Sequence, residues 1–129
     1  MTNVEFRMTN EIISTKPEDI HKRIFKWVIF CLKFLHKLPR NSVNNVIIYQ
    51  LAKSCSSTGA NDQEADNASS RRDFISKYKL VKKELAESIF WLKVLRELES
   101  TIFDESLLNE ANELLKIVAS IILSAQKHT

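Results

Sequence analysis

The stretch SVNNVIIYQLAKSCSSTGANDQEAD, residues 42–66, decides the fold class. Apolar and small residues recur in it at spacings of three and four, which is the period of an amphipathic α-helix. Ser42 can cap this helix at its start, and the predicted turn after it is DNASS, residues 66–70. The predicted inward face becomes small and polar in its second half and comprises Val43, Val46, Ile47, Gln50, Leu51, Ser54, Cys55, Thr58, Asn61 and Ala65.

Three further amphipathic segments flank this helix. The first is predicted for residues 17–38, because a proline suits its first turn and another proline follows its end. The third is predicted for residues 70–99 and begins at Ser70, which resembles a capping box with Asp73. The fourth begins after Asp104 and carries its apolar residues on one face.

Short loops join these four segments, and short loops make consecutive helices pack antiparallel. The predicted fold is therefore all-α: an antiparallel up-down-up-down four-helix bundle over residues 17–129, with residues 1–16 as an N-terminal arm. One Gly and two Pro in 129 residues are too few for the turns of an all-β domain or for a Gly-rich phosphate loop. The one glycine, Gly59, falls inside a helix, where it favours close approach of a neighbouring helix.

The two cysteines, Cys31 and Cys55, both fall in apolar helical patterns. The sequence shows no secretory signal, so we expect buried free thiols in a reducing cytoplasm, and one disulfide between them is the alternative. The most apolar stretch, residues 24–35, contains two lysines and is too short to span a bilayer. The sequence thus predicts a cytoplasmic protein without a membrane segment.

The formal net charge is only +3, but it is unevenly distributed along the chain. Residues 1–40 carry 8 basic and 4 acidic groups and residues 71–99 carry 8 and 5, whereas residues 41–70 carry 1 and 3 and residues 100–129 carry 2 and 4. The basic residues of the first and third helices form a stripe on each helix. Such stripes either follow a phosphate backbone or are solvated faces that pair with acids of neighbouring helices. The predicted nucleic-acid-binding residues are Lys22, Lys26, Lys33, Lys37, Arg40, Arg72, Lys79 and Lys83.

A group of polar residues faces the predicted seam between the second and third helices. With the turn near residues 67–68, antiparallel packing places Ser57 near Tyr78 and Ser54 near Val81. A buried or half-buried network there is either a ligand or active site, or a device that fixes the helix register. The predicted polar motif comprises Gln50, Ser54, Ser57, Asn61, Glu64, Lys77 and Glu84.

Metal and catalytic patterns are weak in this sequence. One Glu-x-x-His occurs, at Glu18 and His21, whereas a di-iron bundle needs two such pairs and further carboxylates. The histidines lie at no diagnostic spacing from Cys or Ser for nucleophilic catalysis. We therefore expect no metal, no cofactor, no small-molecule substrate and no enzymatic activity, since an enzyme would need strongly perturbed acids around Asn61, Glu64 and Glu84.

The first helix contains more apolar residues than one core stripe requires. Surplus apolar surface of this extent indicates self-association. The alternative is a wide core stripe with some solvent-exposed aromatic residues. The predicted contacts between copies are Phe25, Ile29 and Phe30.

Residues 50–92 contain an ordered series of motifs: QLAKSCSSTGANDQEA at 50–65, DFISK at 73–77 and KELAESIFWL at 83–92. The series resembles the 23S rRNA intervening sequence family, also called the S23 ribosomal protein family, whose pattern reads approximately QLxRSxxSIGANxxEA, DFIxK and KExxExxxWL. The resemblance covers about residues 20–126. This chain departs from the pattern at Lys53 (usually Arg), at Thr58 (usually Ile) and at Asp62, where an apolar or aromatic residue is common.

The resemblance implies a cytoplasmic bacterial four-helix bundle that assembles as a homopentamer. Some family members are encoded within inserts of large-subunit ribosomal RNA genes. A related set of pentameric bundles serves as accessory factors in diversity-generating retroelements, where a basic surface binds nucleic acid and reverse transcriptase. No enzymatic activity is established for the family. We therefore expect a non-enzymatic oligomeric protein that binds RNA or a nucleoprotein partner through the basic faces of its first and third helices. The alternative is a protein–protein interaction scaffold with no nucleic-acid role.

Overall fold

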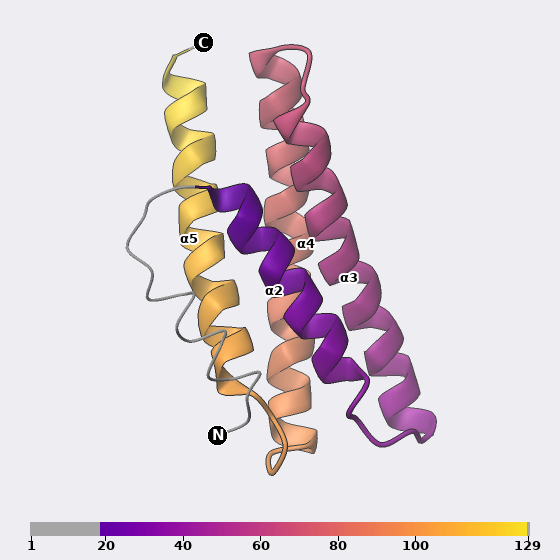
Figure 1. Ribbon diagram of the computed structural model, residues 1–129. Helices are drawn as coiled ribbons and strands as arrows, with labels where there is room; N and C mark the ends of the chain where they lie inside the picture. The colour runs from indigo at the N-terminus through magenta and orange to yellow at the C-terminus, as the bar shows by residue number, and fades with distance from the viewer. Residues whose placement is uncertain (1–18, 129) are drawn as a thin grey trace.

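The computed structural model describes residues 19–128, and within this range the chain forms four α-helices and no β-strand. The helices are α2 (Ile20–Leu35), α3 (Ser42–Asp66), α4 (Arg71–Leu98) and α5 (Glu105–Lys127), as Figure 1 shows. The predicted all-α class is confirmed. The predicted N-terminal arm, residues 1–16, and the predicted start of the first helix at Pro17 lie outside the described residues.

Side-chain caps fix where α3 and α4 begin. Asn41, rather than the predicted Ser42, caps α3, because its side-chain oxygen accepts a 2.8 Å hydrogen bond from the backbone N–H of Asn44. Ser70 caps α4 as predicted, since its hydroxyl oxygen accepts a 3.0 Å hydrogen bond from the backbone N–H of Asp73. Each cap satisfies a backbone donor that the first helical turn leaves unpaired.

α2 is the shortest of these helices, with 16 residues against 25 in α3. It ends at Leu35, three residues earlier than predicted, and a turn at residues 36–38 leads to Pro39. At 1.5 Å per residue α2 is about 24 Å long and α3 about 37 Å. No helix in the described range is both long enough and apolar enough to cross a bilayer.

Each helix lies beside two of the others, as Figure 1 shows. α2 and α4 each pack against α3 and α5, whereas α2 and α4 are diagonal and are not neighbours. Along α3 and α4 the paired residues run in opposite directions, since Ser54 meets Ser88 and Asp62 meets Tyr78. The two basic helices, α2 and α4, are therefore separated by the two acidic ones.

The core fills the space between the helices with fully buried large side chains. Trp27, Leu51, Tyr78, Leu85 and Leu107 come from all four helices and are at most 1% exposed. The indole N–H of Trp27 donates a 3.1 Å hydrogen bond to the carbonyl of Leu107, so its one polar atom is satisfied inside the core. Burying an aliphatic or aromatic side chain of this size stabilises the fold by about 1.5–3 kcal/mol.

The start of α3 corrects the predicted inward face. Val43 and Val46 are both 58% exposed, and Asn44 occupies the inward position between them. The side-chain amide of Asn44 donates to the carbonyl of Pro39 at 3.0 Å and to the carboxylate of Glu99 at 3.2 Å. These contacts tie α3 to the preceding loop and to the end of α4. Two further residues of the predicted inward face, Gln50 and Asn61, are only half-buried.

The single glycine, on α3, packs directly against α2. A Cβ atom added to Gly59 would lie 3.2 Å from Cγ2 of Val28, which is tighter than ordinary van der Waals contact. The position has no unusual backbone conformation, because no glycine has a positive φ. Close packing is therefore the reason for glycine here, as the sequence predicted.

Candidate functional site

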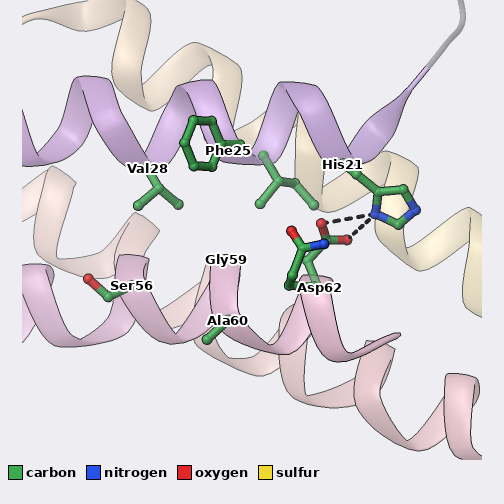
Figure 2. Close-up of a pocket in the computed structure, with 9 residues that line it drawn as sticks. His21, Phe25, Val28, Ser56, Gly59, Ala60 and Asp62 are labelled. Carbon is green, nitrogen blue, oxygen red and sulfur yellow. Dashed lines mark hydrogen bonds and ion pairs between the residues drawn. The ribbon is translucent and has the colours of Figure 1, made fainter. Parts of the chain in front are cut away.

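A groove of about 290 Å³ lies along the seam between α2 and α3 (Figure 2). Val28 points from α2 toward Gly59. The small residues of α3 on this side, among them Gly59 and Ala60, leave room beside this contact. Phe25 stands at the opening and is 64% exposed, although it belongs to the lining. The residues that line the groove are His21, Ile24, Phe25 and Val28 from α2, and Ser56, Gly59, Ala60, Asp62 and Gln63 from α3.

A polar cluster closes one end of the groove. His21 Nδ1 lies 2.9 and 3.0 Å from the two carboxylate oxygens of Asp62, and the hydroxyl of Tyr78 donates a 2.7 Å hydrogen bond to the same carboxylate. His21 Nε2 lies 3.2 Å from an oxygen of Asp66. The imidazole thus ties α2 to α3, and Tyr78 ties α3 to α4.

The surroundings of Tyr78 determine its protonation. Burial first, and then the hydrogen bond and the charge of Asp62, raise the pKa of Tyr78 far above its usual range, because a phenolate would be desolvated beside a carboxylate. Tyr78 is therefore a permanent hydrogen-bond donor at physiological pH. Asp62 is itself only 2% exposed, and both of its oxygens are engaged. The contacts of Asp62 with His21 and Tyr78 are therefore suited to fixing the positions of α2, α3 and α4 relative to one another.

Asp62 is the residue of this site whose role the sequence analysis missed. From the sequence, Asp62 was recognised only as a departure from the family pattern. The signal was nevertheless present, because Asp62 lies four residues after Thr58 and three before Ala65, and both neighbours face inward. A carboxylate at an inward position requires donors from other helices, and His21 and Tyr78 supply them.

The predicted polar motif does not form one network, because the register of α3 against α4 differs from the prediction. Ser54 meets Ser88 at 2.8 Å, two helical turns beyond Val81. Tyr78 meets Asp62 and not Ser57. The observed register pairs two buried hydroxyl groups with each other, whereas the predicted one would have left the hydroxyl of Ser54 against a valine.

The other members of the polar motif make separate contacts. Lys77 forms an ion pair of 3.5 Å with Glu64, and the side-chain amide of Asn61 donates to the carbonyl of Ser57 one turn earlier. Glu84 contributes its backbone carbonyl, which accepts from Ser88 at 3.0 Å. Among residues 19–128 there is no group of three or more His, Cys, Asp or Glu side chains placed to hold a metal ion.

The predicted basic residues are exposed on two separate helices. Those of α2 and of the loop after it lie on the outer side of that helix, and those of α4 lie on the outer side of the diagonal helix. The structure therefore presents two basic faces rather than one continuous surface. Their members are Lys22, Lys26, Lys33, Lys37 and Arg40 on the first face, and Arg72, Lys79 and Lys83 on the second.

One basic residue of α2 turns inward instead. Arg23 binds Glu110 of α5 through two contacts, Nη2 to Oε1 at 2.6 Å and Nε to Oε2 at 3.1 Å. Glu110 is only 4% exposed, so this bidentate pair compensates a buried carboxylate. The hydrogen bond to Glu110 also raises the pKa of Arg23, which keeps the guanidinium charged.

The three residues predicted to contact other copies differ in exposure. Phe25 is 64% exposed and available for contact, and Ile29 is half-buried. Phe30 is 8% exposed and belongs to the core, so its assignment to a surface between copies is wrong. Phe30 follows Trp27 by three residues, and this helical spacing turns both side chains inward.

The two cysteines are free and buried, as predicted. Their thiols influence each other across the α2–α3 seam. Burial raises the pKa of Cys31, and the hydrogen bond from Cys31 lowers the pKa of Cys55. Cys55 is therefore the more acidic of the two thiols.

No protein-family model matches the chain, and no curated protein matches it closely enough to count as a relative. Solved structures do match it, among them the crystal structure of a protein from Bacteroides thetaiotaomicron that has unknown function and belongs to the S23 ribosomal protein family. It is 30% identical in sequence, with a TM-score of 0.68, and the match covers 81% of this chain and 98% of that one. Identity at this level over nearly the whole of the other protein confirms the resemblance seen in the motifs. The chain therefore belongs to the S23 ribosomal protein family.

Proposed function

We propose that this protein is a non-enzymatic, oligomeric helical bundle of the bacterial cytoplasm that binds RNA or a nucleoprotein partner through the basic faces of α2 and α4. The observation that supports this most is the outer face of α2. Lys22, Lys26 and Lys33 on this short helix and Lys37 in the turn after it are all exposed. A row of exposed lysines attracts the phosphates of a nucleic acid by releasing condensed counterions.

The diagonal arrangement of α2 and α4 refines this proposal. The two basic faces do not adjoin, because α2 and α4 are not neighbours. One copy of the protein therefore binds a nucleic-acid segment with one face at a time, and its other face can bind a second segment. In an oligomer, equivalent faces of different copies add up to a larger basic surface. Association through several copies raises the overall affinity without new contacts.

The experiment that tests this function is a titration of a structured RNA with the protein at several salt concentrations, followed by fluorescence anisotropy. Binding through phosphates should weaken steeply as salt rises, because each neutralised phosphate adds to the salt dependence. Binding that cannot be detected at low salt would exclude the RNA-binding function.

The second candidate function is a protein–protein interaction scaffold. The exposed apolar side chains of the described surface favour it, among them Phe25, Tyr49 and Phe90. A partner captured from cell extract that stays bound after nuclease treatment would support the scaffold. A partner released by nuclease would support RNA binding.

The assembly that we propose is the homopentamer of the family, built from bundles in up-down-up-down order. Of the predicted contact residues, half-buried Ile29 is the one that we expect in the interface between copies. Multi-angle light scattering gives the mass of the assembly directly. A monodisperse monomer at micromolar concentration would contradict the oligomer.

A further inference from the structure

We propose that the groove between α2 and α3 receives one unpaired base of an RNA strand, with Phe25 as its stacking surface. This inference rests on the proposed function, RNA binding through the basic face of α2. It adds the kind of RNA, namely a single strand or an unpaired loop rather than a duplex.

The first support is the position of Phe25. The side chain is 64% exposed and at the same time lines the groove, so its ring stands at the opening (Figure 2). An exposed aromatic ring beside a cavity offers a face on which a base can stack, and stacking of this kind tolerates any base.

The second support is the charge beside Phe25. Lys22 precedes it by three residues, which places both side chains on neighbouring positions of the helix surface. Lys26 follows Lys22 by one turn, and both lysines are exposed. Phosphates bound along these lysines would hold a strand parallel to α2, with its bases turned toward the groove.

The third support is the shape and polarity of the groove. Its volume of about 290 Å³ is just below the range for pockets of drug-sized ligands, roughly 300–1,000 Å³, so that it suits a small group such as a single base. Its walls include Ile24, Val28 and Gly59, which are apolar or small, whereas Ser56 and Gln63 bring a hydroxyl and an amide to the α3 side. These polar groups match the hydrogen-bonding edges of an unpaired base.

The acidic end of the groove explains why only the base enters. Asp62 and Asp66 lie there, bound to His21, and their charge disfavours a phosphate at that end. The phosphates therefore remain on the lysine side of α2, and the uncharged base occupies the groove. A duplex does not offer such a base, because its bases are stacked inside the helix.

The test compares one short oligoribonucleotide, labelled with fluorescein, as a single strand and annealed to its complement, by anisotropy at low salt. The variants are Phe25→Ala and, as the matched control, Phe90→Ala. Phe90 is also an exposed aromatic residue, but it lies on α4, which is not a neighbour of α2. Both variants change an exposed ring only, so both should fold. Tryptophan at the same position, Phe25→Trp, adds a direct readout, since stacking of a base quenches its emission.

We expect Phe25→Ala to weaken single-strand binding roughly 5- to 100-fold, as for the loss of one base–aromatic stack. Duplex binding and the salt dependence should stay unchanged, because the lysines remain. Phe90→Ala should bind as the wild type does, and the Phe25→Trp emission should be quenched by the single strand. Equal losses in the two alanine variants, or single-strand binding unaffected by Phe25→Ala, would overturn the groove proposal while RNA binding stands. Absence of binding to either form by the wild type would overturn the proposed function itself.

Discussion

The hydroxyl of Tyr78 on α4 donates a 2.7 Å hydrogen bond to the carboxylate of Asp62 on α3, and both side chains are buried. Removing the hydroxyl in Tyr78→Phe leaves the carboxylate without one of its donors. Hydrogen bonds to charged groups contribute about 1.5–3 kcal/mol, so we expect the free energy of unfolding to fall by about 2 kcal/mol. Urea denaturation measures it. The control Tyr49→Phe changes an exposed hydroxyl and should stay within about 0.5 kcal/mol of the wild type.

The pH dependence of stability should report the same residue. The pKa of Tyr78 is raised in the folded protein, so above pH of about 10 the unfolded chain releases this proton and the native state keeps it. The unfolded state then binds fewer protons, and stability falls as pH rises, by up to about 1.4 kcal/mol per pH unit for one group. Below that pH the contribution is present in full.

Tyr78→Phe lacks this titration, so its stability should decline less steeply in alkaline solution than that of the wild type. Urea denaturation from about pH 8 to 11 compares the two slopes. Parallel curves for the two proteins would show that Tyr78 is not held protonated by burial and by Asp62.

The burial of Asp62 also shows how far the sequence could predict the structure. The helical periods located four helices and the cap at Ser70, because the spacing of apolar residues and capping chemistry are local. The partner of Ser54 is not local. The position of the turn alone does not determine which residue of α4 lies opposite Ser54. That register also depends on the pairing of the buried hydroxyl groups of Ser54 and Ser88 across the two helices.

The wrong assignments have the same origin. Val43 and Val46 were placed inside because they are apolar, whereas Asn44 takes the inward place through hydrogen bonds to Pro39 and Glu99. Those partners lie in a loop and at the end of another helix. The basic stripe of α2 was likewise predicted from its helical spacing. The separation of α2 from α4, however, follows only from the packing of all four helices.

The Arg23–Glu110 pair gives a third prediction. Arg23→Ala leaves the carboxylate of Glu110 buried without its bidentate partner. Breaking a buried pair costs about 3–5 kcal/mol, and partial exposure of Arg23 reduces this, so we expect about 2–3 kcal/mol in urea denaturation. Arg23→Lys keeps the charge but loses the planar fork, and it should restore only part of the stability. Full stability in Arg23→Ala would show that the pair contributes little.

The buried thiols give a fourth prediction. Cys31 and Cys55 are inaccessible, and reaction requires a thiolate, so iodoacetamide should modify neither in the folded protein at neutral pH. In denaturant both should react completely, which mass spectrometry shows as two added carbamidomethyl groups. Rapid modification without denaturant would mean that the α2–α3 seam opens in solution.

The central claim is that the lysines of α2 bind RNA, and charge reversal tests it most directly. One variant replaces four lysines of the α2 face by Glu: Lys22, Lys26, Lys33 and Lys37. The control variant makes the same change in net charge with four exposed lysines elsewhere: Lys53, Lys93, Lys116 and Lys127. The Kd for a structured RNA at low salt is measured by anisotropy for both variants and the wild type. We predict that the α2 variant loses at least about 10-fold in affinity and part of its salt dependence, and that the control loses much less. Equal losses in the two variants, or no RNA binding by the wild type, would contradict the claim.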